Sequence, residues 1–565
     1  MSALVALPVL LPLLGAGLAL TLSKRPRAQR VVSTFVLTIV VVIAALLVYE
    51  ADRNGPQTVW VGAWPEPLGI SLVADRLSSL MLLVSAVVTL AVLVYSIGQG
   101  MTSDGRDTPV SIYHPTFLVL SAGVANAFLA GDLFNLFVSF EILLFASYVL
   151  LTLGGTSARI RAGTIYVVVN MLSSMLFLIS VAAVYAATGT VNLAQLSLRL
   201  GELPEAVSLV LQLMLLTTFC IKAAVFPLSL WLPDSYPTAP APVTAVFAGL
   251  LTKVGVYAIL RAQSLLFPDS PLTDLLLVAA MLTMLVGVLG AIAQSDIKRM
   301  LSFTLVSHIG YMIFGVGLAT IEGYSGAIVY VVHHITIQAA LFLVVGLVER
   351  RGGSTSLLKL GGLARLSPLL AVLFFVPAMN LAGIPPMSGF LGKVGLVDAG
   401  IQVATPLAYV LVASSVLTSL LTLYAVAKTW NLAFWRTPEQ AHEAALAIRE
   451  MESEDAAPLP NAPARPHRDD SPAATATLTT RDIDEARRIA DADDDTDQDM
   501  YQLMEQDALP TRLPRLMVGA ASGLIAASLA LTIAAGPLFA YTDRTAADLI
   551  DRDTYISSVL PQDAR

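Results

Sequence analysis

The sequence has few charged residues and almost no cysteine. Only 13% of its 565 residues are charged, about half the share found in soluble globular domains. The single cysteine, Cys220, lies in an apolar run, which excludes a disulfide framework, an iron–sulfur ligand set and a haem-attachment motif. The sequence also has no nucleotide-binding loop, metal-ligand cluster or nucleophile triad. We therefore expect no cofactor, no metal site and no stand-alone enzyme, and any redox chemistry would belong to a partner.

Hydrophobic residues make up most of the chain instead. They account for 56% of it, and the mean hydropathy of +0.75 lies beyond the range of soluble domains. The sequence therefore predicts an all-α polytopic membrane protein. The formal net charge of -8 comes from one segment, because residues 437–512 hold 19 acidic and 7 basic residues. An acidic excess confined to one loop gives no reason to expect a nucleic-acid partner.

Apolar runs of roughly 20 residues, the length that crosses a bilayer, recur along the chain. The first, residues 3–22, has no basic segment before it and no small-residue cleavage site, so we interpret it as a membrane helix and not a signal peptide. About fourteen spans are expected in total. They lie near residues 3–22, 31–49, 77–98, 114–130, 133–153, 164–187, 206–232, 243–262, 272–293, 300–319, 325–348, 367–397, 406–434 and 516–541.

Basic residues gather on one side of this arrangement. Clusters of lysine and arginine follow the first, fifth, ninth and eleventh spans, whereas the short loops after even-numbered spans carry almost none. Because cytoplasmic loops carry the excess of basic residues, this pattern places both termini outside the cell membrane. The clustered residues are Lys24, Arg25, Arg27, Arg30, Arg159, Arg161, Lys298, Arg299, Arg350, Arg351, Lys359 and Arg365.

The seventh and twelfth spans are longer than a crossing requires. Both contain prolines, which interrupt helices: Pro227 in the seventh, Pro385 and Pro386 in the twelfth. Because the two spans are five apart, equivalent elements would enter the membrane from opposite sides. We therefore predict two inverted five-helix repeats, spans 4–8 and 9–13, in which helices 7 and 12 are broken.

The expected division of the chain follows from these spans. Residues 436–513 are rich in Pro, Ser, Thr, Ala and Asp, a composition that favours a disordered acidic loop on the cytoplasmic side, with a short helix around 480–490 as an option. A docking or regulatory role for this loop is the alternative. The parts are residues 1–110 with helices 1–3, 111–265 with the first repeat, 266–435 with the second repeat, the loop 436–513, and 514–565 with the last helix and a tail.

Four charged residues stand alone inside apolar runs: Glu141, Lys222, Lys253 and Lys393. A lysine in the bilayer core costs roughly 2.5–3.5 kcal/mol on insertion scales, and such residues normally face a protein or water-filled interior. A lysine can also lose its proton when it is desolvated, whereas arginine stays charged. A single membrane lysine could equally snorkel or form a structural salt bridge. Four such groups on different helices favour a line of proton-transferring residues.

Three histidines share these apolar runs: His308, His333 and His334. Buried histidines are most often helix-packing residues that satisfy a neighbour, and this is our interpretation of His308 and His333 as supporting residues. For His334, a role in proton transfer and a role in helix packing are equally compatible with the sequence.

Four stretches resemble one known family. They are DLFNLFVSFEILLFASYVLL (132–151), IKAAVFPLSLWLPDSYPTAPAPVTAVFAGLLTKVGVYAILR (221–261), DIKRMLSFTLVSHIGYM (296–312) and AGIPPMSGFLGK (382–393). They are similar to the antiporter-like subunits shared by Mrp-type cation/proton antiporters and the proton-pumping arm of NADH:quinone oxidoreductase. The resemblance covers roughly residues 75–435, and the setting of Glu141 together with a lysine at 253 is most similar to the D-type subunits of Mrp antiporters.

The resemblance implies a role for each of the intramembrane residues. Glu141 would be the fifth-helix acid paired with Lys222, and Lys253, His334 and Lys393 would continue a hydrated polar axis along the membrane midplane. Na+ and H+ would be the transported ions, with other antiporter subunits and the lipid bilayer as partners and with no Na+ site assigned. The sequence departs from the family at 338, where Gln338 stands in place of the common eleventh-helix lysine.

Two other functions fit parts of this pattern. The first is a proton-pumping membrane subunit of NADH:quinone oxidoreductase or of a membrane-bound hydrogenase, in which electron transfer supplies the energy. The second is a membrane scaffold that only assembles other subunits, for which Lys222, Lys253 and Lys393 would all be dispensable.

Overall fold

The prediction of an all-α polytopic membrane protein is confirmed by a computed structural model of the chain. The structure describes residues 3–64, 69–100, 110–455, 498–510 and 512–560. Within these ranges, 13 helices are long and apolar enough to cross a membrane. A further crossing consists of two shorter helices separated by a break, α16 (Pro368–Ala382) and α17 (Ser388–Val403). This agrees with the expected number of spans.

The crossing helices follow one another with short connections. They are α1 (Ala3–Thr21), α2 (Pro26–Asn54), α3 (Arg76–Gln99), α4 (Val110–Leu129), α5 (Leu133–Thr152), α6 (Ser157–Thr188), α8 (Glu205–Ala223), α10 and α11 (Ala241–Val246 and Thr252–Arg261), α12 (Thr273–Ala293), α13 (Ile297–Leu318), α14 (Ile321–Gly352), α16, α17, α18 (Pro406–Thr429) and α22 (Arg515–Ile533). Single π-helical turns join α10 to α11 and extend α11 and α18; they are Phe247–Leu251, Ala262–Leu266 and Trp430–Trp435.

The remaining elements are short and lie between or after the crossings. They are the antiparallel strands β1 (Gln57–Trp60) and β2 (Ser71–Ala74), in which Gln57 lies opposite Ala74, and the helices α7 (Leu193–Arg199), α9 (Trp231–Ser235), α15 (Leu363–Leu366), α19 (Pro438–Asp455), α21 (Met500–Glu505), α23 (Ala535–Asp551) and α24 (Asp553–Val559). Three-residue 3-10 turns occur at Val61–Ala63, Leu200–Glu202 and Tyr236–Thr238.

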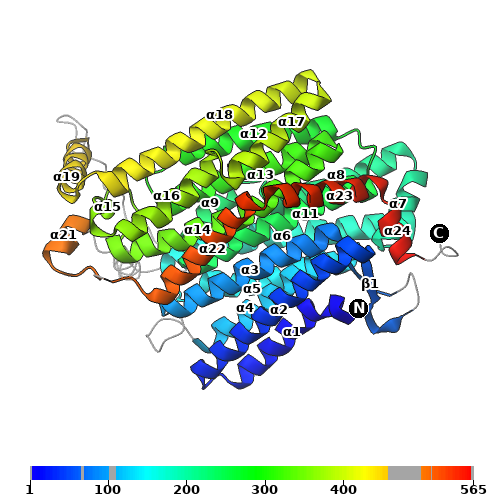
Figure 1. Cartoon of the computed structure of the whole chain (residues 1–565), viewed down its shortest axis with the longest axis horizontal. Helices are drawn as coiled ribbons and strands as arrows, with labels where there is room; N and C mark the ends of the chain where they lie inside the picture. Colours follow the sequence, from blue (N-terminus) through cyan, green and yellow to red (C-terminus); the bar gives the residue numbers. More distant parts are fainter. Residues whose placement is uncertain (1–2, 65–68, 101–109, 456–497, 511, 561–565) are drawn as a thin grey trace, which may run out of the picture.

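The helices run roughly side by side along the long dimension of the molecule. Figure 1 shows α1 and α2 at one edge and α18 at the opposite edge, with α22 and α23 running between them. The start of α1 and the end of α24 lie at the same end of the molecule, and α19 and α21 lie at the other end (Figure 1). Which end of the molecule faces the cytoplasm stays a prediction.

The break in the seventh span begins before its proline. Helix α8 ends at Ala223, and Ala224 adopts a left-handed conformation with φ 58, so Pro227 lies beyond the helix and not inside it. The predicted break is therefore present, and α8 ends at Ala223, the residue whose carbonyl would need the amide hydrogen that Pro227 lacks. The break is held by hydrogen bonds from the Phe226 amide to Thr283 Oγ1 (3.0 Å) and from Trp231 Nε1 to the Ile221 carbonyl (3.2 Å).

The break in the twelfth span has the same plan. Helix α16 ends at Ala382, and Gly383 follows with φ 86. Pro385 and Pro386 lie in the irregular stretch before α17 begins at Ser388. Both predicted interruptions are therefore present, each just after a residue in the left-handed region.

The two predicted five-helix units have matching landmarks. Each of the following pairs is separated by 164 residues: the aspartate caps of α5 and α13, the threonine caps of α6 and α14, and the left-handed glycines that end α6 and α14. Helices α6 and α14 both have 32 residues. These pairs are Asp132 and Asp296, Thr156 and Thr320, and Gly189 and Gly353.

A close helix crossing recurs at the same spacing. A Cβ on Gly123 of α4 would lie 2.7 Å from the Leu143 nitrogen of α5, and a Cβ on Gly287 of α12 would lie 2.5 Å from the Ser307 nitrogen of α13. Both glycines are therefore required for backbone contact between the first two helices of each unit. The agreement supports the predicted repeat of spans 4–8 and 9–13, and the inverted relation of the two units stays a prediction.

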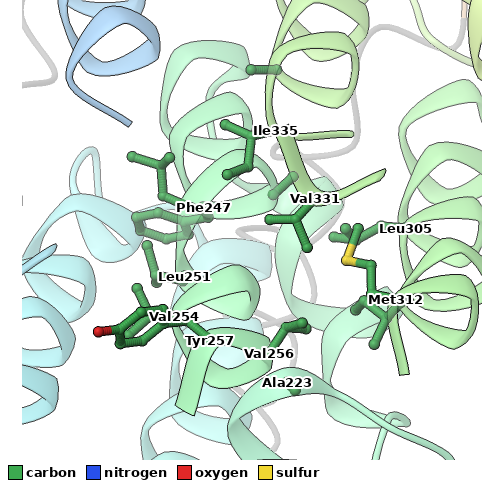
Figure 2. Close-up of a cluster of buried hydrophobic side chains, with 14 of the residues drawn as sticks. Ala223, Phe247, Leu251, Val254, Val256, Tyr257, Leu305, Met312, Val331 and Ile335 are labelled. Atoms are coloured by element: carbon green, nitrogen blue, oxygen red, sulfur yellow. The ribbon is translucent and has the colours of Figure 1, made fainter. Parts of the chain in front are cut away.

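The core lies where the two units meet. Two crossings are buried by other helices: Ala241–Leu266 throughout, and α14 from Gly323 to Val348. Figure 2 shows the apolar side chains that pack there, with Phe247 and Val254 from the first unit and Leu305, Val331 and Ile335 from the second. These two crossings also carry Lys253 and His334, so both residues lie in the centre of the protein and away from lipid.

The 436–513 segment begins and ends with helices. Helix α19 covers Pro438–Asp455 and α21 covers Met500–Glu505. His442 of α19 contacts Asp499, the residue that caps α21. These parts differ from the expected disordered loop because α19 starts at a proline and α21 has a capping box. The expected option of a helix around 480–490 lies outside the described residues.

Candidate functional site

Lys222 is buried in the last turn of α8, directly before the break. Its side chain is 4% exposed, and its Nζ donates to Ser174 Oγ at 3.0 Å and to the Asn170 carbonyl at 3.4 Å. The ammonium also lies 5.6 Å from the centre of the Phe140 ring. Burial of a charge is costly unless it is paired, and here both hydrogen-bond acceptors are neutral. The site can therefore hold the lysine with or without its proton.

Glu141 of α5 lies near Lys222 but does not touch it. The carboxylate interacts electrostatically with the Lys222 ammonium, yet no ion pair within 4.0 Å joins these two described residues. Glu141 is half-buried, and its Oε1 is shielded from solvent without a hydrogen-bond partner. The structure thus brings the predicted pair into range in a separated state.

Lys253 is completely buried in α11, immediately after the first π-helical turn. Its Nζ donates to the Ala248 carbonyl at 2.6 Å, which lies five residues earlier. A π-helical turn is often found at functional sites because it shifts the register of backbone hydrogen bonds. Here the turn precedes the lysine and supplies its acceptor. No carboxylate lies within ion-pair distance of Lys253 among the described residues.

The three histidines gather between α13 and α14. His308 Nδ1 forms a hydrogen bond of 2.9 Å with Tyr330 Oη, and the rings of His308 and His334 lie 5.2 Å apart. Both ring nitrogens of His334 are buried and without a hydrogen-bond partner. His333 is engaged differently, because its Nδ1 contacts Ser388 Oγ at 3.0 Å at the start of α17. His308 and His333 each have one ring nitrogen, Nε2, without a partner, whereas His334 has two.

Lys393 of α17 faces the end of α16 across the second break. Its Nζ donates to the Ala382 carbonyl (2.9 Å) and to Ser419 Oγ (2.7 Å), with the Leu381 carbonyl at 3.3 Å. It also lies over the Tyr311 ring at 5.1 Å. A pocket of about 310 Å³ opens beside it, lined by residues of α16, α17 and α18. Because α16 ends here, its last carbonyls are free to accept from the lysine.

Two tyrosines connect Lys393 with the histidines. The Tyr311 ring, over which Lys393 lies, is 5.1 Å from the Tyr330 ring, and Tyr330 is bonded to His308. The second unit therefore joins Lys393 and the three histidines in one buried cluster. Lys222 lies in the first unit and Lys253 in its last crossing, next to this cluster. The sequence reasoning did not identify the tyrosines, although Tyr330 lies one helical turn before His334.

Gln338 occupies the position where the family commonly has a lysine. It is fully buried, and its Nε2 donates to the Leu301 carbonyl at 2.8 Å while its Oε1 has no partner. The side chain thus bonds to the backbone of α13, and an amide does not titrate. His334, one turn earlier, is the titratable residue nearest to it on α14.

Within the described ranges, no group of three or more His, Cys, Asp and Glu side chains is placed to hold a metal ion. The titratable groups of the site are instead spread along six helices, α5, α8, α11, α13, α14 and α17. Such a spread suits transfer of a proton in steps better than binding of one ion by several ligands.

Comparisons with known proteins show the family of this chain. Residues 130–421 match the family described as "NADH:quinone oxidoreductase/Mrp antiporter, TM". The chain is 41% identical over 449 residues to the D subunit of the Na(+)/H(+) antiporter of Alkalihalophilus pseudofirmus, covering 78% of this chain and 90% of that protein. It is 40% identical over 455 residues to the Na(+)/H(+) antiporter protein of the same type from Bacillus subtilis, covering 79% of this chain and 91% of that protein.

Solved structures extend the likeness to the whole chain. A chain of the Mrp complex from Dietzia sp. DQ12-45-1b matches with a TM-score of 0.82 at 33% identity, covering 99% of this chain and 100% of that chain. A chain of respiratory complex I from Thermus thermophilus matches with a TM-score of 0.67 at 22% identity, covering 92% and 99% of the two chains, and shows a shared fold alone. The resemblance found in the sequence is confirmed: this multi-pass membrane protein belongs to the family of transmembrane subunits shared by NADH:quinone oxidoreductase and Mrp antiporters.

Proposed function

We propose that this chain is an ion-translocating subunit of a multisubunit Na+/H+ antiporter and not an enzyme. The observation that supports it most is the series of buried lysines, Lys222, Lys253 and Lys393, whose hydrogen bonds go to neutral oxygens. Buried charges in proteins are normally paired, yet no carboxylate of the described residues lies within 4.0 Å of these three lysines. The likeness to D-type antiporter subunits at about 40% identity favours antiport over electron-transfer-driven pumping.

Protons move along the membrane midplane in this proposal. Glu141 stabilises the protonated form of Lys222, and when the two groups separate, Lys222 passes its proton toward Lys253. The change in charge then reaches His334 and, through His308, Tyr330 and Tyr311, the ammonium of Lys393.

The membrane potential can drive these steps. It supplies about 2.3 kcal/mol per charge per 100 mV, and each titratable group on the axis exchanges one charge. Because the two breaks leave helix ends beside Lys222 and Lys393, small movements of α8 and α16 change the contacts of both lysines. Na+ movement in one unit would thereby be coupled electrostatically to proton movement in the other.

The domain division and the sidedness belong to the same proposal. Residues 111–265 and 266–435 form the two translocating units, residues 1–110 and 514–565 flank them, and 436–513 lies in the cytoplasm with both termini outside. Because relatives are subunits of larger assemblies, this chain would act with other antiporter subunits in the bilayer.

The test uses membranes of an antiporter-deficient bacterium. The chain is expressed with its partner subunits and, separately, without them, and dissipation of a pH gradient on addition of NaCl is followed with a fluorescent pH probe. We expect Na+-dependent dissipation from the complete complex only. Copurification with iron–sulfur or quinone-reducing subunits, and a pH gradient that responds to electron donors but not to Na+, would instead establish the electron-transfer alternative.

A further inference from the structure

Asp132, at the start of α5, has one carboxylate oxygen without a hydrogen-bond partner. The residue is 4% exposed, and its Oδ1 accepts the Asn135 amide as the helix cap at 2.6 Å. Its Oδ2 is buried and no donor bonds to it. A buried unpaired carboxylate oxygen is costly and requires an explanation.

The second five-helix unit shows how this oxygen can be satisfied. Asp296 caps α13 in the same way, through the Arg299 amide at 2.9 Å, and its Oδ2 accepts a hydrogen bond from the Thr355 hydroxyl. The residue 164 positions before Thr355 is Val191, whose side chain has no donor. The two caps are otherwise alike, since a backbone bridge joins Asp132 to Asn192 and Asp296 to Ser356. Asp132 therefore has a free oxygen because Val191 stands where the other unit has a threonine.

A pocket of about 640 Å³ adjoins this carboxylate. Asp132 lines it together with Phe134, Tyr185, Val191, Gln195 and Arg199, from the start of α5, the end of α6 and α7. In the proposed orientation, this pocket faces the outside of the membrane.

A line of polar side chains begins one helical turn after Asp132 and leads into the membrane. Asn126 of α4 donates to Asn135 Oδ1 at 3.0 Å and to Ser139 Oγ at 2.7 Å, and all three residues are buried. Ser139 lies two residues before Glu141 on α5. Glu141 lies nine positions after Asp132, roughly 13.5 Å farther along at the helical rise.

We propose that Asp132 is the proton-binding group at the outer mouth of the first unit, where it takes up protons from the pocket for the Glu141 and Lys222 pair. This inference rests on the proposed antiport function and adds to it the place where outside protons are bound. The carboxylate accepts one proton from outside water and releases it to water along the Asn135, Asn126 and Ser139 line. The carboxylate then returns to its ionised form.

A proton suits this site better than a sodium ion. Hard cations require several oxygen ligands, and the other side-chain oxygens here are engaged: Gln195 Oε1 accepts from Thr190 Oγ1 at 2.7 Å, and Asn192 Oδ1 accepts the amides of Ala194 and Gln195 at 3.0 and 3.2 Å. The Arg199 guanidinium also lines the pocket and disfavours a second cation. A proton needs only the free Oδ2.

Burial raises the pKa of Asp132 to about 6. The backbone amides of Asn135 and Phe134 lower this pKa, but their effect is smaller than that of burial. The other charged or titratable groups that face it are Arg199 and Tyr185, which line the same pocket, and Tyr555 of α24, which interacts with it electrostatically. Asp132 is thus protonated below about pH 6 and ionised above it.

The test measures Na+-coupled proton uptake by the whole complex in proteoliposomes, with pH varied on one face at a time. We expect the proton-uptake rate of the wild type to rise in one step as the pH on the outer face falls through about 6. Lowering the pH on the inner face should produce no such step. Asp132→Asn keeps a capping oxygen but cannot ionise, so the step should disappear and the rate at pH 6 should fall several-fold.

Val191→Thr is the matched variant, because it gives Asp132 the donor that Asp296 has and changes no charge. Added hydrogen bonds favour the ionised carboxylate, so the step should move to lower pH by about one unit while the maximal rate at low pH is kept. An unchanged midpoint in both variants would overturn the inference, as would a changed Na+ dependence with an unchanged pH profile. Absence of any exchange by the wild-type complex would refute the antiport function itself.

Discussion

Replacing Gly287 with alanine should force α12 and α13 apart. A Cβ at Gly287 would lie 2.5 Å from the nitrogen and 2.6 Å from the Cα of Ser307, whereas ordinary contact begins at 3.4 Å. Because both neighbours are backbone atoms, no side-chain rotation relieves the contact, and the helices must separate by roughly 0.9 Å. Overpacking of this kind costs about 1–3 kcal/mol.

Moving α12 and α13 apart would also affect the candidate site, because His308 directly follows Ser307 at the crossing. Ser307 donates to the Met284 carbonyl at 2.8 Å, and His308, the following residue, is bonded to Tyr330. The variant should therefore lose stability and some of its transport rate together. The matched control is Gly523→Ala on α22, where a Cβ would meet nothing within 4 Å; there alanine should be neutral or stabilise by up to about 1 kcal/mol.

The assay is thermal unfolding of the detergent-purified complex, followed by size-exclusion chromatography of the fluorescently tagged chain. Gly287→Ala should melt several degrees below Gly523→Ala, and Gly123→Ala, at the equivalent crossing, should behave like Gly287→Ala. Equal melting temperatures for Gly287→Ala and Gly523→Ala would refute the reasoning that these helices meet through their backbones.

Three further changes probe separate contacts. Arg261→Met leaves the buried Asp75 carboxylate without its 2.7 Å partner, so it should cost about 3–5 kcal/mol. Asp75→Asn in the same chain removes the unpaired charge but keeps the oxygen that caps α3, so it should restore part of the melting temperature, and no recovery would contradict a buried pair. Tyr330→Phe removes the hydroxyl bonded to His308 and should cost about 0.5–1.5 kcal/mol in stability and slow Na+-dependent dissipation of the pH gradient; an unchanged rate would exclude this link from the path. Lys253→Met should stop exchange in the assembled complex, and wild-type exchange would exclude Lys253 from the axis.

The sequence was sufficient to predict the crossings and the buried lysines. Neither prediction requires knowledge of tertiary contacts. A long apolar run is stable only inside a membrane or a protein core, and a single lysine within such a run is visible in the sequence itself. Pro227 was sufficient to predict the first break, since α8 ends at Ala223, four residues earlier. The hydrogen bonds of Phe226 and Trp231 beside the break could not be predicted, because they depend on how the chain folds after the helix.

The repeat and the tyrosine links were harder to see. The residues that correspond in the two units differ chemically, as Leu143 and Ser307 do, because what is preserved is the backbone contact with a glycine. Tyr311 and Tyr330 look like ordinary core residues in the sequence, and only the fold of α13 against α14 places them between Lys393 and His308.

The sequence also could not predict that Glu141 and Lys222 are separated in the structure. The resemblance predicts that Glu141 and Lys222 form a pair but not how far apart they lie. In the structure, Lys222 donates to Ser174 and to the Asn170 carbonyl instead. These two partners lie on α6, and nothing in their spacing from Lys222 along the chain indicates the contact.

Exchange by the assembled complex with Lys222→Ala tests the central claim most directly. The control is Lys428→Ala, which removes another lysine whose Nζ donates to backbone carbonyls, those of Ile292 and Gln294. Na+ efflux and proton uptake are measured together in proteoliposomes after blotting has shown equal assembly. We predict that Lys222→Ala abolishes both fluxes and that Lys428→Ala retains them; wild-type exchange by assembled Lys222→Ala would contradict the proposed proton path.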